Sequence, residues 1–542
     1  MNPGYSIAPP NPDADDPWLG FQWQLSDSYN IARVSLANED RSQTALRHFT
    51  VDDEWATLSY RDIDAAATAA AGMLRSRGVK RGDVVGVCLP QCPELLVAHL
   101  ATYELGAIVV PISMLLGDDS LAYSLNHSDA RVLVIDEERY RDLDLSLDDL
   151  EVVSVSIGEY AASPLGGLAP YATDGTEVDP VETAPEDPAL IMYTSGTTGK
   201  PKGVVQGHQY LAGSLPGYQA WFGLFGDTAE NDFRVWTPAE WAWAGALFDV
   251  VFPTLALGGT VVSRERRIGF DANRSLALIE RGRVTYTFLP PTALSRIRSE
   301  GDVSEYDISS LSVVMCGGEK LPGSLLTWAE ERLNATVNEA YGQTEANALI
   351  GNCRAAYPAR PDSMGKPYPG HDIVVVDDSG DAVPRGEIGE IAVELPDPVV
   401  FLGYHDDESA TADKIHGGLF LTGDLALQDE DGYLWHQGRK DDLILTSSYR
   451  VSPLEVESSL ESNASVANAV VGGVPDDNRG QRVKAYVVPA DTDMEETLFK
   501  ESLQQAVRDD LGAHKIPREI EVIDHIPQTR SGKADRASLF DT

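Results

Sequence analysis

Tyr193-Thr194-Ser195-Gly196-Thr197-Thr198-Gly199-Lys200-Pro201-Lys202-Gly203 follows the apolar residues Ala189–Met192, which are typical of the end of a buried strand. Its three glycines, four hydroxyl residues and two lysines can turn backbone N–H groups, hydroxyls and ammonium groups toward one polyphosphate. The spacing is not that of a Walker A loop, because Thr194 and Pro201 stand where that motif requires Gly and Ser/Thr. Composition alone leaves a second interpretation open, namely a surface turn rich in Gly, Ser and Thr.

The residues before this loop alternate between strand and helix patterns. Asp62 is expected to cap one helix, and Gly106 ends another that begins at Pro93. This alternation predicts a layered α/β fold with mostly parallel strands. Strands are expected at 57–60, 84–89, 107–112 and 131–136, helices at 63–77 and 93–105, and a loop at 158–188.

The last hundred residues differ in pattern and in charge. Residues 439–542 hold 13 basic and 19 acidic residues, a net charge of −6, against −37 for the rest of the chain. The lower charge density favours docking of an anionic ligand there. We expect a large N-terminal domain at 1–438 and a small α+β domain at 439–542. In the small domain, strands are expected at 467–476, 482–490 and 518–527 and a helix at about 496–511.

The composition is strongly acidic. The 542 residues include 42 Lys/Arg and 85 Asp/Glu, which gives a net charge of −43 and a pI near 4.4. This balance argues against nucleic-acid binding as the main function, since phosphate contacts need clustered Lys and Arg. Only 11 of the 42 basic residues are Lys. A composition rich in acidic residues and poor in Lys is typical of salt-in halophiles, in which molar salt screens the repulsion between the carboxylates of the protein. An ordinary acidic mesophilic protein is the alternative.

Other features bear on folding and location. A hydrophobic content of 43% excludes a wholly disordered chain. The N-terminus lacks the basic and apolar regions of a signal peptide, and no run approaches 18 apolar residues, so no membrane span is expected. Four cysteines in this length predict reduced thiols and a cytoplasmic location.

Five further motifs follow the loop at 193–203. They are Gly317-Gly318-Glu319, Ala340-Tyr341-Gly342-Gln343-Thr344-Glu345, Thr422-Gly423-Asp424, Gly438-Arg439-Lys440-Asp441-Asp442 and Pro527-Gln528-Thr529-Arg530-Ser531-Gly532-Lys533. In identity and order, the six motifs resemble those of the adenylate-forming superfamily, which includes acyl-CoA synthetases, luciferases and the adenylation domains of peptide synthetases. The resemblance covers nearly the whole chain. It implies ATP as a substrate and a small C-terminal domain that moves.

The resemblance also implies residue roles. Glu345 resembles the Mg²⁺ ligand and Thr344 a neighbour of the phosphates, which suits a cation that takes few protein carboxylates. Tyr341 resembles the aromatic residue that stacks on adenine, and Gly317, Gly318 and Glu319 resemble the wall on the other side of the ring. Asp424 resembles the carboxylate that binds both ribose hydroxyls, and Arg439 resembles a second contact to the ribose and phosphate. The implied ATP and AMP site comprises Thr194, Ser195, Gly196, Thr197, Thr198, Gly199, Lys200, Lys202, Gly317, Gly318, Glu319, Glu339, Ala340, Tyr341, Gly342, Gln343, Asp424, Arg439 and Arg450.

Lys533 resembles the catalytic lysine of the superfamily, a cation brought to an acyl-phosphate transition state. The implied reaction has two steps. A carboxylate attacks the α-phosphorus of ATP to give acyl-AMP and pyrophosphate, and a thiol then attacks the acyl-adenylate. The small domain turns between the steps about a hinge that maps to Asp441.

The acyl pocket is the third feature that the resemblance implies. Pro238–Gly245 resembles the acyl-site entrance of bacterial and archaeal medium-chain and branched-chain synthetases, followed by the apolar run 246–259. Trp241 and Trp243 share a face if the segment is extended; two core tryptophans are the alternative. Acetyl-specific members carry Trp where this chain has Gly342, so the pocket is expected to admit a longer, branched or aryl acid.

The acceptor is inferred from the segment after the hinge. Thioester-forming members usually show Gly-Tyr-Arg-Ile-Gly-Pro there, whereas this chain reads Ser448-Tyr449-Arg450-Val451-Ser452-Pro453. Ser448 and Tyr449 map to the coenzyme A tunnel, and coenzyme A is the favoured acceptor.

Three interpretations stay open: an acyl-CoA synthetase, a stand-alone enzyme that loads a carrier protein or other acceptor, and a non-catalytic regulator that binds ATP or acyl-AMP. No carrier domain is expected in the nine residues after Lys533. The presence of Glu345, Asp424, Arg439 and Lys533 argues against the regulator.

Overall fold

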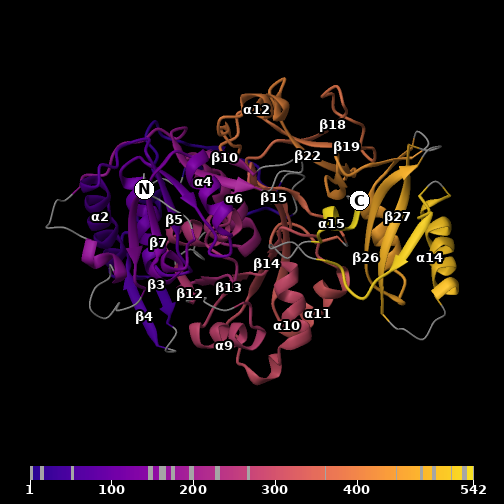
Figure 1. The fold of residues 1–542 in the computed structure, drawn as a ribbon, viewed down its shortest axis with the longest axis horizontal. Coiled ribbons are helices and arrows are strands. Elements are labelled where there is room, and N and C mark those ends of the chain that lie inside the picture. The colour runs from indigo at the N-terminus through magenta and orange to yellow at the C-terminus, as the bar shows by residue number, and fades with distance from the viewer. Residues whose placement is uncertain are drawn as a thin grey trace. The chain divides into compact units, whose positions relative to one another are not determined.

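The structure is a computed structural model with two compact units (Figure 1). The first unit comprises Met1–Ile373 and Val393–Phe420, and the second comprises Val374–Ala392 and Leu421–Thr542. The predicted boundary at 438/439 falls within the second unit and stays a prediction. The structure describes residues 4–12, 17–50, 54–144, 150–157, 166–171, 178–194, 201–225, 232–264, 269–360, 362–446, 449–476, 480–490, 496–513, 515–527 and 534–540.

A seven-stranded sheet of the first unit contains the two strands that flank the loop at 193–203. Its order is β20-β10-β9-β6-β5-β7-β8, and β9, β6, β5, β7 and β8 run parallel. The apolar strands are buried between crossover helices, as parallel strands require. The strands are β5 (Val84–Cys88), β6 (Ile108–Pro111), β7 (Ala130–Asp136), β8 (Glu151–Val155), β9 (Pro188–Thr194), β10 (Lys202–Gly207) and β20 (Gly403–Tyr404); the helices are α2 (Tyr60–Ser76), α3 (Pro93–Glu104), α4 (Asp118–His127) and α5 (Glu137–Arg141).

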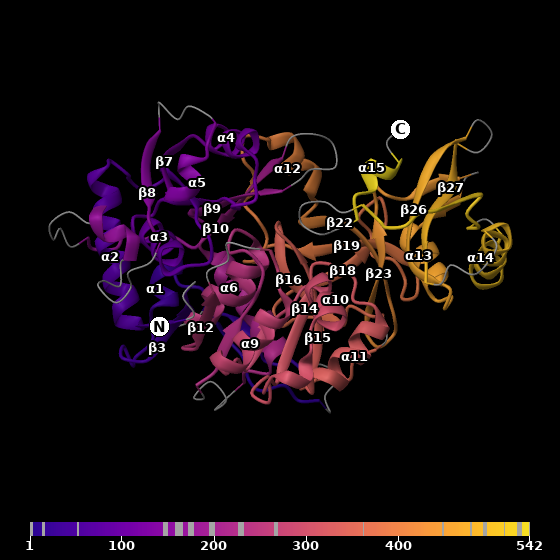
Figure 2. The same cartoon turned by 60° about the horizontal axis from the view of Figure 1, so that its bottom comes forward.

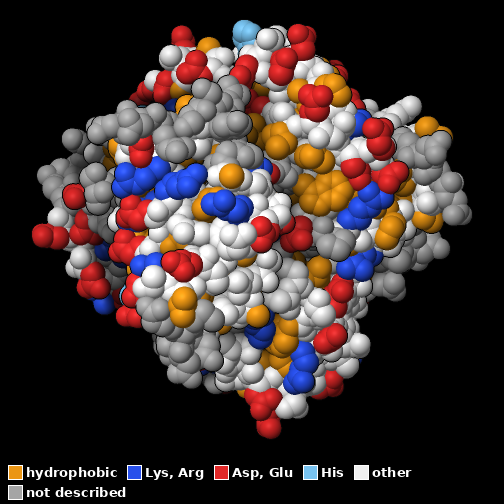
Figure 3. Space-filling view, turned by 90° about the vertical axis from the view of Figure 1, so that its right-hand side faces the viewer, with side chains coloured by type: hydrophobic (Ala, Val, Ile, Leu, Met, Phe, Trp, Pro, Cys, Tyr) orange, Lys and Arg blue, Asp and Glu red, His pale blue; other side chains and the backbone are white. Residues whose placement is uncertain are grey.

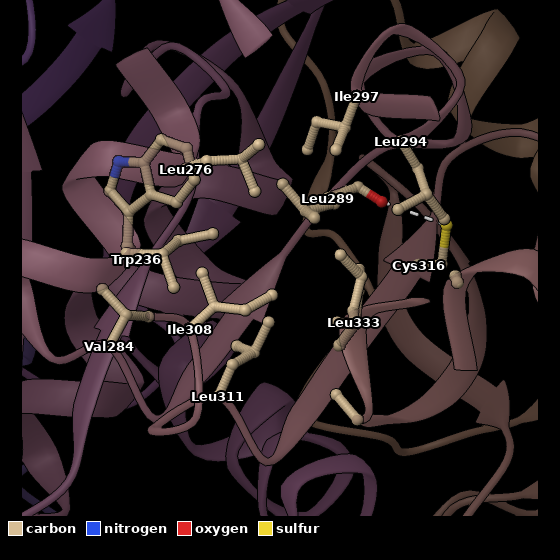
Figure 4. Close-up of a cluster of buried hydrophobic side chains, with 14 of the residues drawn as sticks. Trp236, Leu276, Val284, Leu289, Leu294, Ile297, Ile308, Leu311, Cys316 and Leu333 are labelled. Carbon is tan, nitrogen blue, oxygen red and sulfur yellow. Dashed lines mark hydrogen bonds between the residues drawn. The ribbon is translucent and has the colours of Figure 1, made fainter. Parts of the chain in front are cut away.

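A nine-stranded sheet in the same unit has the order β17-β16-β15-β14-β13-β11-β12-β3-β4. Helices α9, α10 and α11 pack apolar side chains on it, and Figure 4 shows this cluster around Leu276, Leu294 and Leu333. The strands are β3 (Thr44–Phe49), β4 (Trp55–Ser59), β11 (Arg234–Trp236), β12 (Thr260–Arg264), β13 (Tyr286–Phe288), β14 (Val313–Gly317), β15 (Thr336–Gln343), β16 (Ala346–Gly351) and β17 (Lys366–Pro367); the helices are α9 (Ala272–Gly282), α10 (Pro291–Glu300) and α11 (Gly323–Leu333).

Helix α6 (Gln209–Phe222) lies between the two sheets and contacts β10, β14, β15 and β16. Almost all of its side chains are buried, which fits a helix that is apolar on every side. The shorter elements of the unit are β1 (Tyr5–Ser6), β2 (Gln22–Trp23), α1 (Ile31–Ser35), α7 (Ala244–Ala246), the π-helical turn Leu247–Val251, α8 (Phe252–Ala256), α12 (Glu408–Lys414), β21 (Ile415–His416) and the 3₁₀ turns Gly166–Tyr171 and Val303–Glu305.

The C-terminal part is built on two five-stranded sheets. One has the order β18-β19-β22-β21 with β23 paired to β22, and the other β25-β24-β27-β26 with β28 paired to β27. Helices α13 and α14 lie against the second sheet (Figure 2). They bury Val456, Leu460, Leu503 and Val507 there. The elements are β18 (Ile373–Val376), β19 (Ile388–Glu394), β22 (Leu419–Gln428), β23 (Leu434–Arg439), β24 (Ile444–Thr446), β25 (Tyr449–Val451), α13 (Pro453–Glu461), β26 (Val466–Asp476), β27 (Gly480–Pro489), α14 (Glu496–Leu511), β28 (Glu519–Val522) and α15 (Arg536–Phe540).

This architecture confirms the predicted α/β fold with a large and a small part. The expected strands and helices agree with the observed elements to within a few residues. The predicted cap of α2 was wrong by one turn: Ser59 caps the helix, and Asp62 completes a capping box by accepting the N–H of Ser59. No helix of the described residues is long and apolar enough to cross a membrane.

Candidate active site

The predicted phosphate loop closes a hairpin. Strands β9 and β10 are antiparallel, and Thr194 pairs with Lys202 and Gly203 with Tyr193. Ser195, Gly196, Thr197, Thr198, Gly199 and Lys200 lie outside the described residues, but both flanks of the loop are fixed. Tyr193 Oη lies 3.0 Å from His127 Nδ1, and Tyr123 Oη donates to the carbonyl of Pro201 at 3.0 Å. The side chains of α4 therefore hold the base of the loop.

Thr344 and Glu345 form the tip of a second hairpin. Strands β15 and β16 pair Gln343 with Ala346, so these two residues make the turn. Gln206 Nε2 donates to the Thr344 carbonyl at 2.7 Å, and the Phe401 N–H donates to the Glu345 carbonyl at 2.8 Å. The turn that was predicted to carry the Mg²⁺ ligand is thus held from β10 and from the segment before β20.

One side-chain relay joins the two hairpins. Tyr404 in β20 donates from Oη to Glu345 Oε1 at 2.7 Å. The face of the same ring lies 5.0 Å from Lys202 Nζ, a cation–π distance. A cation from the phosphate-loop hairpin and a carboxylate from the Thr344–Glu345 turn are therefore fixed by one tyrosine. Sequence reasoning missed Tyr404 and Gln206, because neither stands in a recognised motif.

The residues predicted to flank adenine also lie together. Parallel strands β14 and β15 pair Gly317 with Ala340, so Gly317-Gly318-Glu319 and Ala340-Tyr341 meet at the carboxyl edge of the sheet. A Cβ on Gly317 would lie 2.7 Å from the Ala340 carbonyl oxygen, and Gly318 has φ +84. The backbone geometry therefore favours glycine at both positions. Desolvation raises the pKa of Glu339, which the Leu321 N–H partly offsets, to about 7.

The prediction that Gly342 leaves open pocket volume was wrong. A Cβ on Gly342 would lie 2.5 Å from the backbone nitrogen of Ala348. The β15–β16 ladder is irregular between Tyr341 and Gln343, and Ala348 has φ +50. This bulge brings the backbones of β15 and β16 together. Glycine at position 342 therefore allows the two strands to approach closely and does not leave open pocket volume.

Trp241 and Trp243 do not share a face, which corrects the second acyl-pocket prediction. The segment is a turn followed by α7 and not an extended strand. Trp241 is buried, whereas Trp243 is 43% exposed. Gly245 lies against Phe288, since its Cβ would be 3.0 Å from Phe288 Cε1. Of the two tryptophans, only Trp241 lies in the interior.

Sequence reasoning missed Asp249, a buried carboxyl in the π-helical turn that follows α7. Asn347, two residues after Glu345, donates from Nδ2 to Asp249 Oδ1 at 2.5 Å. Burial raises the pKa of Asp249 to about 7, against which the Asn347 hydrogen bond acts. A lone acidic residue within the apolar run 246–259 was the signal that could have revealed it.

The second unit brings together the predicted ribose residues. Strands β22 and β23 pair Asp424 with Arg439, and Arg439 Nη1 lies 3.4 Å from Asp424 Oδ2. His436 Nε2 lies 3.3 Å from Asp424 Oδ1, a contact that no motif indicated. The Asp424 carboxylate is 7% exposed, so it accepts hydrogen bonds in a confined place, as the recognition of two adjacent hydroxyls requires.

The remaining predicted residues belong to the hinge, the catalytic lysine and the coenzyme A segment. Asp441 is exposed in a turn between β23 and β24, a position that suits a hinge. Lys533 and Ser448 lie outside the described residues. Tyr449 and Arg450 belong to β25, although the structure describes only their backbone.

Comparisons with known proteins agree with these motifs. A family model described as AMP-binding enzyme matches residues 36–405, and one for the AMP-binding enzyme C-terminal domain matches residues 455–533. 4-Hydroxybutyrate–CoA ligase 1 of Metallosphaera sedula is 33% identical over 527 residues, which is 96% of this chain and 90% of that protein.

Solved structures show the same fold. The anthranilate CoA ligase AuaEII in complex with anthranoyl-AMP has a TM-score of 0.82 and 27% identity, covering 95% of this chain and 97% of that one. ATP-bound MatB from Rhodopseudomonas palustris has a TM-score of 0.83 and 25% identity, covering 95% and 98%. With the hairpins and the Asp424–Arg439 pair in place, the chain belongs to the AMP-binding enzyme family of the adenylate-forming superfamily and is an ATP-binding, AMP-forming acid–CoA ligase.

Proposed function

We propose that this ligase activates a medium-chain, branched or aryl carboxylic acid and transfers its acyl group to coenzyme A in the cytoplasm. Two relatives that act on acids larger than acetate, namely 4-hydroxybutyrate and anthranilate, support this substrate class by their names. The run that contains Leu247, Phe248 and Phe252 is apolar and buried, and we propose that it adjoins the acyl pocket.

The relay of Lys202, Tyr404 and Glu345 is the observation that carries the proposed chemistry. It places an ammonium group and an oriented carboxylate beside the flanks of the phosphate loop. Oxygen donors suit Mg²⁺, so the Glu345 carboxylate and the Thr344 hydroxyl would hold that ion, which would neutralise phosphate charge. Among the described residues no group of three His, Cys, Asp or Glu could hold a metal.

In the first half-reaction, a carboxylate oxygen of the acid bonds to the α-phosphorus of ATP. The bond from that phosphorus to the bridging oxygen breaks, and pyrophosphate leaves. Negative charge grows on the α-phosphate, where positioned cations stabilise it. Lys202 from β10 and Lys533 from the small domain are proposed to supply these cations, while Tyr341, Asp424 and Arg439 orient the nucleoside.

In the second half-reaction, the thiolate of coenzyme A attacks the acyl carbon, the bond to AMP breaks, and AMP leaves. We propose that the domain at 439–542 turns about Asp441 between the two steps, so that Lys533 withdraws and the segment at Ser448 and Tyr449 admits the pantetheine. A hinge needs only residues that are free to change φ and ψ, and the exposed turn at Asp441 supports this choice of position.

A panel of free acids tests the proposal. Acetate, butyrate, hexanoate, 4-hydroxybutyrate, isobutyrate and benzoate are each supplied with ATP and Mg²⁺, with and without coenzyme A, and pyrophosphate and acyl-CoA are measured. We expect acyl-CoA only with coenzyme A and a higher kcat/KM for a larger acid than for acetate. A preference for acetate would contradict the substrate class. Acyl-AMP that forms but never yields acyl-CoA would point to a carrier-protein acceptor.

A further inference from the structure

A buried carboxylate, Glu390 in β19, joins two segments of the second unit. Its Oε1 accepts the backbone N–H of Gly423 at 2.8 Å, and its Oε2 lies 2.9 Å from Lys440 Nζ. The Glu390 side chain is only 6% exposed. A carboxylate with so little access to water depends on its protein donors, so these two contacts define its role.

Both partners of Glu390 adjoin the pair of residues proposed for the ribose. Gly423 precedes Asp424, Lys440 follows Arg439, and the Lys440 N–H donates to the Gly423 carbonyl at 2.8 Å. Gly423 has φ +80, a left-handed conformation that other residues rarely adopt. A single carboxylate thus fixes the turn before Asp424 and the residue after Arg439.

Lys440 also adjoins the proposed hinge. Its ammonium group lies 3.1 Å from Asp378 Oδ1 as well as against Glu390, and the Glu390 hydrogen bond raises the pKa of Lys440. The next two residues, Asp441 and Asp442, are exposed in a turn. The chain is therefore anchored at residue 440, immediately before the proposed hinge at Asp441.

We propose that Glu390 and Lys440 form a clamp that positions Asp424 and Arg439 for the ribose of ATP and fixes where the hinge begins. Neither residue touches substrate in this proposal; both act through the backbone of Gly423 and Lys440. The inference rests on the proposed function, since it takes Asp424 and Arg439 as nucleotide ligands. A merely structural ion pair would affect folding without a selective effect on nucleotide affinity.

Four variants test the clamp. Glu390→Gln keeps an acceptor for the Gly423 N–H but removes the charge opposite Lys440, Lys440→Met removes the cation, and the double variant closes a mutant cycle. Glu521→Gln is the matched control, because Glu521 Oε2 also lies 2.9 Å from a lysine, Lys484, away from this pair. KM for ATP and kcat are measured at saturating acid and coenzyme A, and ATP affinity is measured by calorimetry without acid.

We expect each single variant of the clamp to raise KM for ATP and the calorimetric Kd about tenfold, with kcat within about threefold of wild type. The double variant should bind ATP no more weakly than the single variant with the lower affinity, because both changes remove the same interaction. The control should match wild type.

Unchanged ATP affinity in both single variants, additive losses, or loss of kcat at constant KM would overturn the clamp. If Glu390→Gln does not fold, Lys440→Met decides, because its side chain is 38% exposed. A wild-type protein that releases no pyrophosphate with any acid would instead refute the proposed function, and the calorimetry would still test the clamp.

Discussion

Tyr404 shows at the level of one residue how the two halves of the phosphate site depend on each other. Its hydroxyl orients Glu345, and its ring face lies against Lys202. The sequence motifs identified Lys202 and Glu345, because their neighbours are distinctive. They could not identify Tyr404, since its contact joins positions 59 residues apart and depends on the pairing of β10 with β20.

Tyr404→Phe separates the two contacts of that ring. The phenyl ring keeps the face toward Lys202, but Glu345 loses its hydrogen bond. A hydrogen bond to a charged group is worth about 1.5–3 kcal/mol, so kcat/KM for MgATP should fall roughly tenfold to a hundredfold. Tyr140→Phe, at a tyrosine that is 41% exposed, is the control. A Tyr404→Phe enzyme as active as wild type would show that the hydroxyl does not position Glu345.

The buried carboxyl of Asp249 makes the stability of the protein depend on pH. Burial raises its pKa from 3.8 to about 7, so between those values the folded protein retains a proton that the unfolded chain has lost. This group therefore lowers the free energy of unfolding as pH rises from about 4 to about 7, and the loss is complete above pH 7. Asp249→Asn removes the titratable proton and keeps a side-chain oxygen that can accept the hydrogen bond from Asn347.

The stability of Asp249→Asn relative to wild type should therefore increase by about 2–4 kcal/mol between pH 4.5 and pH 8. Urea unfolding of both proteins at several pH values in high salt measures the difference. A difference that stays constant over this range would mean that Asp249 is ionised in the folded protein.

At the scale of elements, the hairpin of β15 and β16 explains both a success and a failure of sequence reasoning. Local patterns predicted the strands and helices well, because apolar runs, Pro93 and Gly106 act within a few residues. The bulge at Gly342 could not be predicted, because it arises from two backbones that approach each other. The segment at Trp241 and Trp243 is a turn followed by α7 and not extended, so the condition under which the two tryptophans would share a face is not met.

Gly342→Ala tests the bulge. Its new Cβ would lie 2.5 Å from the Ala348 nitrogen, and such overpacking costs about 1–3 kcal/mol. We expect a lower midpoint of urea unfolding and lower activity with every acid, without a change in chain-length preference. Gly323→Ala, where no atom lies within 4 Å, is the control. A shift toward acetate at full stability would restore Gly342 as a pocket wall.

For the whole molecule, the dominant property is its net charge of −43. On the face shown in Figure 3, acidic side chains are scattered between small groups of Lys and Arg. Local pairs such as Lys484 with Glu519 exist, but they cannot offset so large an acidic excess. The screening length is about 3 Å at 1 M salt and about 10 Å at 0.1 M, so distant carboxylates repel each other only in dilute salt.

The halophile interpretation therefore predicts a Tm that rises with salt. Thermal unfolding followed by circular dichroism from about 0.1 to about 3 M KCl measures this, because added salt screens the repulsion. KM for ATP, itself an anion, should fall over the lower part of that range. A Tm that is constant or falls with KCl would show that the acidity is not an adaptation to salt.

In the proposed mechanism, the substrate carboxylate itself attacks the α-phosphorus of ATP. Turnover of the best acid of the panel, labelled with ¹⁸O in its carboxylate, tests this directly by mass spectrometry of the products. Because the attacking oxygen stays on phosphorus when the acyl group leaves for coenzyme A, we predict one ¹⁸O in each AMP and none in pyrophosphate. Unlabelled AMP, or ADP and labelled phosphate, would contradict an acyl-adenylate mechanism.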